Sequence, residues 1–409
     1  MRQVIITVNG PGEISAWLTP LSRALKARAP DLHIAVCLQP CVFSSGAERS
    51  VVDAIEDVDA VCSIAEGLDL IARRRFPPGF QTEADTLVVH LGGELALSAL
   101  LARRLGARSM AYVEYPAGIL KRFDRVLYNG LGKMPKKIGR IRPDYVGEMM
   151  VDAALAKAGH RADGAPLIGV FPGSRTYMIE FLLPYFAAAI DQIAAKRPDI
   201  EWAMARSDYT SDDVLRALKP PPADRDWIAS PVTFREDGDA RWFETEGGVR
   251  IDVFPGAEVF QRARVALTLP GTNTGEMAAL GIPMVTVIPT YEACADQVPL
   301  PGLAGHVARI PLVGPWIKRK AARLALRGMN MVAMPNRRKG EMIVPEIVGQ
   351  DLHGAIETAL LGLFDDPNQG AAQAVREAMG PPGAAEKLAE AALAQFAPAP
   401  RAAPVRAAI

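Results

Sequence analysis

Three short loops carry residues that could bind an anion or move a proton, and each follows an apolar run of strand length. The first loop, residues 9–15, reads Asn-Gly-Pro-Gly-Glu-Ile-Ser. Gly12 allows its backbone to approach a ligand closely, while Glu13 and Ser15 add a carboxylate and a hydroxyl. A plain structural turn explains this loop as well as ligand binding does.

The second loop, residues 171–175, places a glycine, a hydroxyl and a guanidinium directly before an amphipathic run. Backbone amides at Gly173 and Ser174 would point from a helix N-terminus toward an anion, and Arg175 could grip a phosphate with two donors. The alternative is an ordinary helix cap beside a solvated arginine. Because three suitable features coincide, we predict a diphosphate site here.

The third loop, residues 270–276, follows an apolar run and precedes a helix of small residues. Its amides and hydroxyls could contact phosphate oxygens, and Glu276 could accept both hydroxyl protons of a ribose. The alternative is that Asn273 or Thr274 only satisfies the start of the helix. We predict that this loop binds a nucleotide through Gly271, Thr272, Asn273, Thr274 and Glu276.

Loops of this kind must be held by a sheet, and the pattern of the chain predicts two. Short apolar runs alternate with helical patterns from residue 4 to residue 105, and the alternation restarts at residue 166. Such alternation predicts a parallel sheet covered on both faces, with ligands bound beyond the carboxyl ends of the strands. We therefore predict an α/β protein with two Rossmann-like, doubly wound domains facing a cleft, followed by C-terminal helices.

Changes in composition set the predicted boundaries. A polar stretch at residues 159–164 separates an N-terminal domain, 1–160, from a second domain, 161–350. Residues 351–396 are predicted to form helices that pack back on the domains, and 397–409 an Ala/Pro-rich disordered tail. Residues 206–248 are rich in charge, proline and glycine, which predicts a surface insertion.

The composition excludes several classes of protein. Forty-six basic residues balance 46 acidic ones, so no net field favours nucleic acid as a partner. Four scattered cysteines do not make a secreted disulfide framework, and Cys37 with Cys41 lacks the second pair that zinc needs. The first apolar run is too short for a signal peptide, and no run approaches the roughly 18 residues of a membrane helix. We expect a cytoplasmic protein without metal or cofactor.

These loops resemble motifs of the lipid A disaccharide synthases, over most of the chain to about residue 360. Residues 172–186 are similar to that family's PGSRxxEIxxLLPxF, residues 271–285 to GTATLEAALLGTPMV, and residues 335–346 to its PN and REIVPE elements. Gly12, Glu13 and Ser15 resemble the opening GExSGD, and residues 146–152 resemble VGHPLVD. The resemblance implies a glycosyltransferase of the GT-B type that takes a UDP-sugar, bound by Arg175 and residues 271–276.

The departures from these motifs concentrate in the first domain. Trp17 stands where the family has the aspartate of GExSGD, and Glu148 replaces the histidine of VGHP. No aspartate occurs at residues 91–94, where the family's IDxPDF motif should fall. Met178 replaces the glutamate after PGSR, and residues 341–342 replace the arginine and glutamate of REIVPE. We infer that the nucleotide half of the site is kept and the acceptor half is rewritten.

An inverting glycosyl transfer needs a base for the acceptor hydroxyl and positive groups for the departing diphosphate. Arg175 and helix dipoles could serve the diphosphate, so no metal is required. Candidate bases are Glu94 and Glu13, ranked above His90 because a lone histidine in an apolar strand is usually a core residue. Glu94 could instead be only a carboxylate in the first turn of a helix.

The predicted partners are a UDP-sugar, such as UDP-N-acetylglucosamine or an acylated derivative, and a lipid or saccharide acceptor. For a lipid acceptor, residues 73–80 and 120–123 mix basic and apolar side chains suited to the inner face of the cytoplasmic membrane, although ordinary packing explains them equally well. The resemblance also allows a homodimer. A UDP-sugar 2-epimerase and a non-catalytic nucleotide-sugar-binding protein remain open, because one fold hosts all three.

Overall fold

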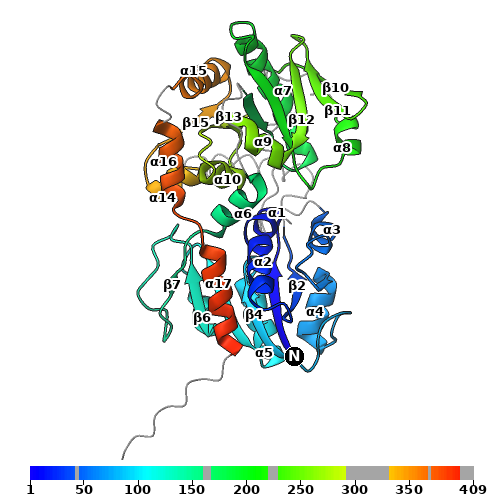
Figure 1. Cartoon of the computed structure of the whole chain (residues 1–409), viewed down its shortest axis with the longest axis vertical. Coiled ribbons are helices and arrows are strands. Elements are labelled where there is room, and N and C mark those ends of the chain that lie inside the picture. The colour runs from blue at the N-terminus through cyan, green and yellow to red at the C-terminus, as the bar shows by residue number, and fades with distance from the viewer. Residues whose placement is uncertain (42–45, 160–166, 220–228, 292–330, 367–369, 397–409) are drawn as a thin grey trace, which may run out of the picture.

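The structure is a computed structural model, and it describes residues 1–41, 46–159, 167–219, 229–291, 331–366 and 370–396. Its described residues form two α/β domains stacked along the long axis of the molecule (Figure 1). The prediction of two doubly wound domains with C-terminal helices is confirmed. The predicted boundary at residue 160 and the predicted tail at 397–409 lie outside the described residues.

The first domain is built on a parallel sheet with the strand order β3-β2-β1-β4-β5-β6-β7. Its strands are β1 (Arg2–Val8), β2 (His33–Leu38), β3 (Ala60–Cys62), β4 (Asp85–His90), β5 (Arg108–Val113), β6 (Arg125–Tyr128) and β7 (Asp144–Tyr145). Its helices are α1 (Pro11–Glu13), the π-helix η1 (Ile14–Leu18), α2 (Thr19–Arg28), α3 (Glu48–Asp53), α4 (Ile64–Arg73), α5 (Leu95–Leu105), the 3₁₀ helix η2 (Gly118–Arg122) and α6 (Met149–Ala158). The strand order reverses between β1 and β4, so the loops after these strands open a crevice where ligands bind in such folds.

The second domain has the strand order β10-β11-β12-β9-β8-β13-β14-β15. Its strands are β8 (Leu167–Phe171), β9 (Glu201–Arg206), β10 (Val232–Asp237), β11 (Ala240–Thr245), β12 (Arg250–Pro255), β13 (Ala263–Thr268), β14 (Met284–Pro289) and β15 (Glu346–Gly349). Its helices include α7 (Thr176–Ala194), α8 (Asp212–Arg216), α9 (Gly256–Arg262), α10 (Asn273–Ala279) and α14 (Met334–Lys339). From β12 to β15 every neighbouring pair of strands is parallel.

Residues 232–237 and 240–245, within the segment predicted to be a surface insertion, are strands of this sheet, so that prediction is wrong for them. The segment holds α8 and the antiparallel pair β10 and β11, which lengthens the sheet beside β12. Phe243 is buried with 1% of its surface exposed, and the ring of Phe234 lies 5.2 Å from it. The buried Phe243 and the half-buried Phe234 stabilise the hairpin on the sheet, although charged residues fill its outer face.

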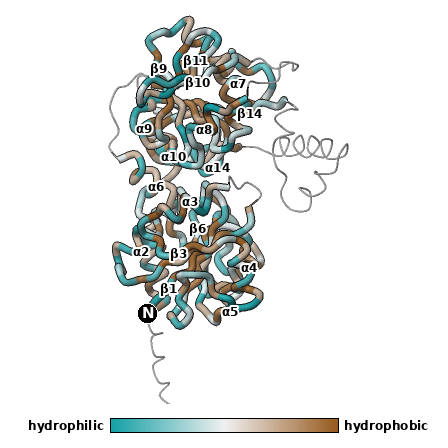
Figure 2. Tube along the Cα trace, turned by 90° about the vertical axis from the view of Figure 1, so that its right-hand side faces the viewer, coloured by the Kyte–Doolittle hydropathy of each residue, from teal (hydrophilic) through white to brown (hydrophobic). Residues whose placement is uncertain are grey.

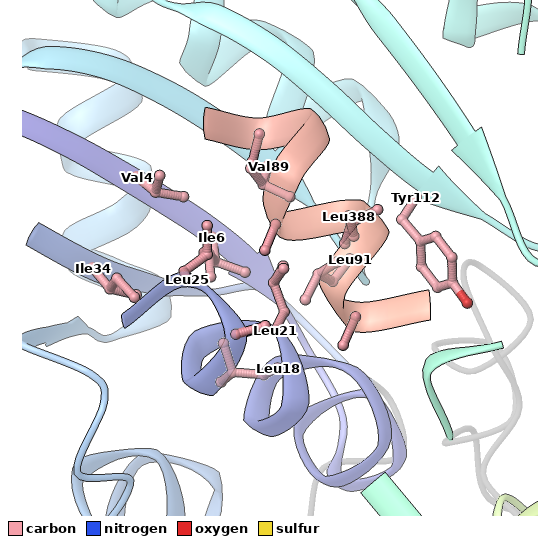
Figure 3. Packing of buried hydrophobic residues seen from close by; sticks show 14 of the residues in the cluster. Val4, Ile6, Leu18, Leu21, Leu25, Ile34, Val89, Leu91, Tyr112 and Leu388 are labelled. Atoms are coloured by element: carbon pink, nitrogen blue, oxygen red, sulfur yellow. The ribbon is translucent and has the colours of Figure 1, made fainter. Parts of the chain in front are cut away.

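The C-terminal helices contact both domains. Helix α15 (His353–Phe364) packs on α7, α16 (Gly370–Met379) packs on α10 and α14, and α17 (Ala384–Leu393) packs on α2 and α6 before the short η3 (Ala394–Phe396). Asp152 accepts hydrogen bonds from the backbone nitrogens of Gly383 and Ala385, which holds the start of α17 to α6. Leu388 of α17 then joins the core formed by Ile6 and Leu25 (Figure 3).

Apolar side chains gather inside each domain, where the tube of Figure 2 is brown along the central strands. The apolar residues suggested for a membrane surface are among the buried ones: Phe80 and Phe123 are 7% and 3% exposed, and Leu120 is fully buried. That prediction is wrong for these three side chains, because they pack in hydrophobic cores against strands of the first sheet. Within the described residues, no helix combines the length and the apolar character needed to cross a membrane.

Candidate functional site

A cavity of about 690 Å³ lies between the carboxyl ends of the two sheets. Among the described residues, most of its lining comes from the segments that follow β1, β8, β9 and β13. The cavity lies where parallel α/β sheets bind ligands. It brings together most of the residues that we predicted from the sequence: Gly12, Glu13, Ser15, Gly173, Ser174, Arg175, Gly271, Thr272, Asn273 and Glu276.

A second cavity of about 750 Å³ adjoins the first on the side of β5 and α14. The two cavities share five lining residues: Gly12, Glu13, Pro270, Gly271 and Thr272. The remaining lining combines the apolar side chains of Trp17, Leu131, Met150, Met331, Val332 and Met334 with the polar ones of Glu114, Tyr115 and Arg337. Glu13 therefore lies at the junction, where groups bound in the two cavities could meet.

The two domains touch beside this junction. A methyl group placed on Gly12 would collide with the Oγ1 atom of Thr272, so only glycine permits this approach. From the second domain, the Tyr209 hydroxyl donates to the backbone oxygen of Pro11 at 3.3 Å. The first loop is thus held by direct contacts against the segments that follow β9 and β13.

Glu13 has an environment suited to a proton acceptor. Its side chain lies against Gly92, where an added Cβ would stand 3.0 Å from the Glu13 Cγ atom. Burial raises the pKa of the Glu13 carboxyl above its ordinary value, and the positive charge of Arg175 opposes part of that rise. A carboxylate with a raised pKa is a stronger base than an exposed one.

The PGSR loop places a positive guanidinium and a helix N-terminus at the first cavity. Gly173 has a φ of 105°, a conformation that favours glycine, and the 19-residue helix α7 starts at Thr176. Arg175, at the N-cap position, lines the cavity with Ser174. A diphosphate bound here would meet both the guanidinium and the positive end of the helix dipole.

Two further cations line this cavity and were missed from the sequence. Lys157 reaches it from α6, with its Nζ atom 5.6 Å above the ring of Phe260 and 3.9 Å from Asp208 Oδ2. Arg206, at the end of β9, forms an ion pair with Asp212 at 3.3 Å. Arg206 could have been predicted as a lining residue because it ends a strand. No local sequence pattern predicts that Lys157, within α6, lines the cavity.

The structure does not bring Thr274 into either cavity. Its side chain is fully buried, donates to the Gly271 oxygen at 2.7 Å and accepts from the Met334 nitrogen at 3.0 Å. Thr274 therefore supports the loop from inside, although no side chain of the described residues caps the start of α10. Asn273 lines the first cavity while its Nδ2 atom donates to Thr268 Oγ1 at 2.7 Å, and Glu276 lines it with 8% of its surface exposed.

Glu94 does not line either cavity. It is exposed at the N-cap of α5, where its backbone nitrogen donates to Gln39 Oε1 at 2.7 Å. His90 is 4% exposed, its Nδ1 atom lies 2.8 Å from Ser98 Oγ, and burial lowers its pKa to about 4. His90 is therefore a neutral core residue at pH 7, in line with its low rank, and Glu13 is the better placed of the two predicted bases.

Glu114 is a carboxylate of the second cavity that we did not predict. It directly follows β5, and burial together with the negative charge of Glu148 raises its pKa, while Arg337 opposes the rise. Its place at the carboxyl end of a strand was the available signal. The sequence pattern of residues 108–113 did not reveal that strand, so the signal was missed.

The segment that resembles PN and REIVPE supports the wall of the second cavity. Asn336 is fully buried and accepts hydrogen bonds from the nitrogens of Ile343 and Val344. Glu346 accepts from the nitrogens of Val332 and Ala333. These contacts hold residues 331–333, which lead into α14, so Asn336 and Glu346 have a structural role here.

No family model matches the chain. Two solved structures have similar folds over nearly the whole chain. MurG of Acinetobacter baumannii gives a TM-score of 0.50 at 13% identity and covers 96% of this chain and 100% of its own. A UDP-N-acetylglucosamine 2-epimerase gives a TM-score of 0.51 at 12% identity and covers 97% of both chains. The fold is GT-B.

Curated relatives with a weak but significant similarity are named lipid-A-disaccharide synthase. That of Nitrobacter winogradskyi is 26% identical over 272 residues, 64% of this chain and 54% of the relative. That of Geobacter sulfurreducens is 25% identical over 321 residues, 72% of this chain and 70% of the relative. The chain spans about half the length of the first curated relatives that it matches.

Proposed function

We propose that this GT-B chain is a glycosyltransferase that takes a UDP-sugar, such as UDP-N-acetylglucosamine or an acylated derivative, and transfers the sugar to a lipid or saccharide acceptor. The observation that carries the proposal is the first cavity, in which the loops after β1, β8 and β13 converge with Arg175 and Glu276. The names of the curated relatives and the fold support the same class of enzyme.

The proposed domain roles follow from the cavities. Residues 161–350 would bind the nucleotide sugar, with the diphosphate at Arg175 and the ribose at Glu276. Residues 1–160 would bind the acceptor, whose hydroxyl reaches the junction at Glu13. Residues 351–396 would hold the two domains together through their contacts with both.

The proposed reaction needs one proton acceptor and one stabilised leaving group. Glu13 would take the proton of the acceptor hydroxyl as the oxygen forms a bond to the anomeric carbon. The bond from that carbon to the diphosphate oxygen would break, and UDP would leave with its added negative charge next to Arg175. The first turn of α7 would add the charge of its dipole at the same place.

The first test is calorimetric titration of the full chain with UDP and with UDP-N-acetylglucosamine. We expect binding that Arg175→Ala and Glu276→Ala both weaken. Arg235→Ala and Glu244→Ala, which remove an exposed ion pair on the outer hairpin, are the matched controls and should bind as the wild type does. A folded wild type that binds neither compound would contradict the UDP-sugar proposal.

A UDP-sugar 2-epimerase is the second candidate, and the similarity to the solved epimerase favours it. The two reactions differ in their need for an acceptor. An epimerase consumes UDP-N-acetylglucosamine alone and interconverts two UDP-sugars, whereas a transferase releases UDP and, apart from slow hydrolysis, needs an acceptor. Analysis of products by NMR with and without acceptor separates them. Binding without any turnover would indicate a non-catalytic nucleotide-sugar-binding protein.

We also propose peripheral contact with an anionic membrane through the loop between β6 and β7. This loop presents five exposed cations that have no ion pair among the described residues: Lys133, Lys136, Lys137, Arg140 and Arg142. Clustered basic side chains bind anionic lipid surfaces. Flotation with vesicles rich in phosphatidylglycerol should retain the wild type and release a variant with these five residues changed to glutamine. Wild type that stays unbound would contradict this contact.

A further inference from the structure

Two positions at which the chain departs from the motifs of lipid A disaccharide synthases lie in contact. The indole Nε1 atom of Trp17 donates a hydrogen bond to Glu148 Oε1 at 3.1 Å. Trp17 stands where the motif has an aspartate, and Glu148 where it has a histidine. The two departures therefore form one local arrangement, in which an indole and a carboxylate replace a carboxylate and an imidazole.

Glu148 is the centre of a buried polar cluster. It is the N-cap residue of α6 and accepts from the backbone nitrogen of Met150 at 3.3 Å. Asn129 Nδ2 donates to its other oxygen at 2.6 Å, and Arg338 forms an ion pair with it at 3.4 Å. The side chains of Arg338 and Glu148 are only 8% and 0% exposed. A carboxylate held by this many donors has one orientation, and it fixes the indole that donates to it.

The ring of Trp17 is held on a second side as well. It lies edge to face with Tyr112, at 5.4 Å between ring centroids and 87° between ring planes. Tyr112, whose ring is drawn in Figure 3, is fully buried. Its hydroxyl donates to the Gly147 oxygen at 3.0 Å. The indole is thus a rigid part of the wall of the second cavity.

Trp17 and Glu13 are four residues apart in one continuous helical stretch, so their side chains lie on the same side of it. Both line the second cavity, where Leu131, Met150 and Met334 complete an apolar wall. An indole presents a flat apolar surface, and a pyranose ring has a face of C–H bonds that can pack on such a surface. Hydroxyls at the ring edge would then remain free to reach Glu13.

We propose that Trp17 determines the acceptor: the acceptor's reacting ring is a pyranoside that packs its C–H face on the indole and directs a hydroxyl toward Glu13. Glu148 is the positioning residue that holds the indole and does not itself contact the acceptor. This inference rests on the proposed glycosyl transfer and names the chemical class of its acceptor.

The test uses methyl β-D-glucopyranoside as the probe, with the full chain, in saturation-transfer NMR with and without UDP. In the wild type, the axial protons of one ring face should receive more saturation than those of the other face. Trp17→Phe keeps an aromatic face and should keep this pattern. Trp17→Leu keeps apolar volume without a ring, and should lose the pattern and bind the glucoside about tenfold more weakly.

Trp242→Leu is the matched control, because this tryptophan lies on β11 under Arg250, outside the lining of both cavities. It should leave the pattern unchanged. The positioning part of the proposal is tested with the double variant Glu148→Ala/Arg338→Met, which leaves no unpaired buried charge. This variant should lose the face preference while its affinity for UDP is unchanged, whereas a loss of folding would abolish both.

Each outcome separates the inference from the proposed function. Equal saturation of both ring faces in the wild type, no saturation at all, or a pattern unaltered by Trp17→Leu overturns the inference, even if UDP binds. Failure to bind UDP contradicts the proposed function instead. If UDP does not bind, the saturation of the two ring faces can still be compared, because the glucoside is also measured without UDP.

Discussion

Arg338 of α14 and Glu148 of α6 form an ion pair at 3.4 Å that is almost completely excluded from solvent. Arg338 also donates to the backbone oxygens of Asn129 and Ala378 at 3.1 Å each. The pair therefore ties the end of β6 to α14 and to α16. Glu148 also accepts a hydrogen bond from Trp17 in the wall of the second cavity. The same ion pair therefore stabilises the contact between the domains and holds this wall in place.

We predict that Glu148→Ala lowers the free energy of unfolding by about 3 kcal/mol, because it leaves the charge of Arg338 buried without a partner. Urea unfolding followed by circular dichroism measures the change. Adding Arg338→Met should recover part of the loss, since the orphaned charge is then removed. If the double variant is less stable than Glu148→Ala alone, the cost does not come from an unpaired charge.

Glu13→Gln should lower the rate of sugar transfer by about 100-fold or more, because the amide cannot accept the proton of the acceptor hydroxyl. Its affinity for UDP should stay near that of the wild type. Glu94→Gln is the control, since Glu94 is exposed and lies outside both cavities. The rate of UDP release at a saturating concentration of the UDP-sugar is measured for the wild type and for both variants. Equal rates for Glu13→Gln and the wild type would remove Glu13 as the base.

The transfer rate should fall as the pH is lowered through the pKa of Glu13, which burial places above the ordinary value of 4.5. The base must be ionised to act, so activity is present above this pKa and lost below it. Arg175 lowers the pKa of Glu13, so Arg175→Gln should move the acid limb of the profile to higher pH. Single-turnover rates across pH give both midpoints, and a shift to lower pH would contradict the proposed coupling.

Thr274→Val should lower the free energy of unfolding by about 2 kcal/mol, since the Gly271 oxygen and the Met334 nitrogen would both lose a buried partner. Thr358→Val is the matched control: its hydroxyl donates to the Gly354 oxygen on the exposed side of α15 and should cost little. Because Thr274 does not line either cavity, Thr274→Val should lower stability more than it lowers the affinity for UDP. Calorimetric titration of the folded variant with UDP measures that affinity.

Much of the fold was predictable from the sequence because the relevant signals are local. Apolar runs of strand length alternate with helical spacing, and this alternation specifies parallel sheets wherever it occurs. The loops at residues 9–15, 171–175 and 270–276 carry glycines and polar groups directly after strands, so their place at the carboxyl edge followed from chain order. The hairpin of β10 and β11 was missed because many charged residues surround its one buried aromatic side chain, Phe243.

The order of residues along the chain was enough to predict two doubly wound domains and to place Gly12, Arg175 and Glu276 where a strand passes into the next helix. Packing in the folded chain selects the side chains that enter the cavities. It turns Thr274 toward its own loop, leaves Glu94 on the surface, and places Glu114 and Trp17 in one wall. Direction and burial depend on packing between segments far apart in the chain, and spacing along the sequence does not encode that packing.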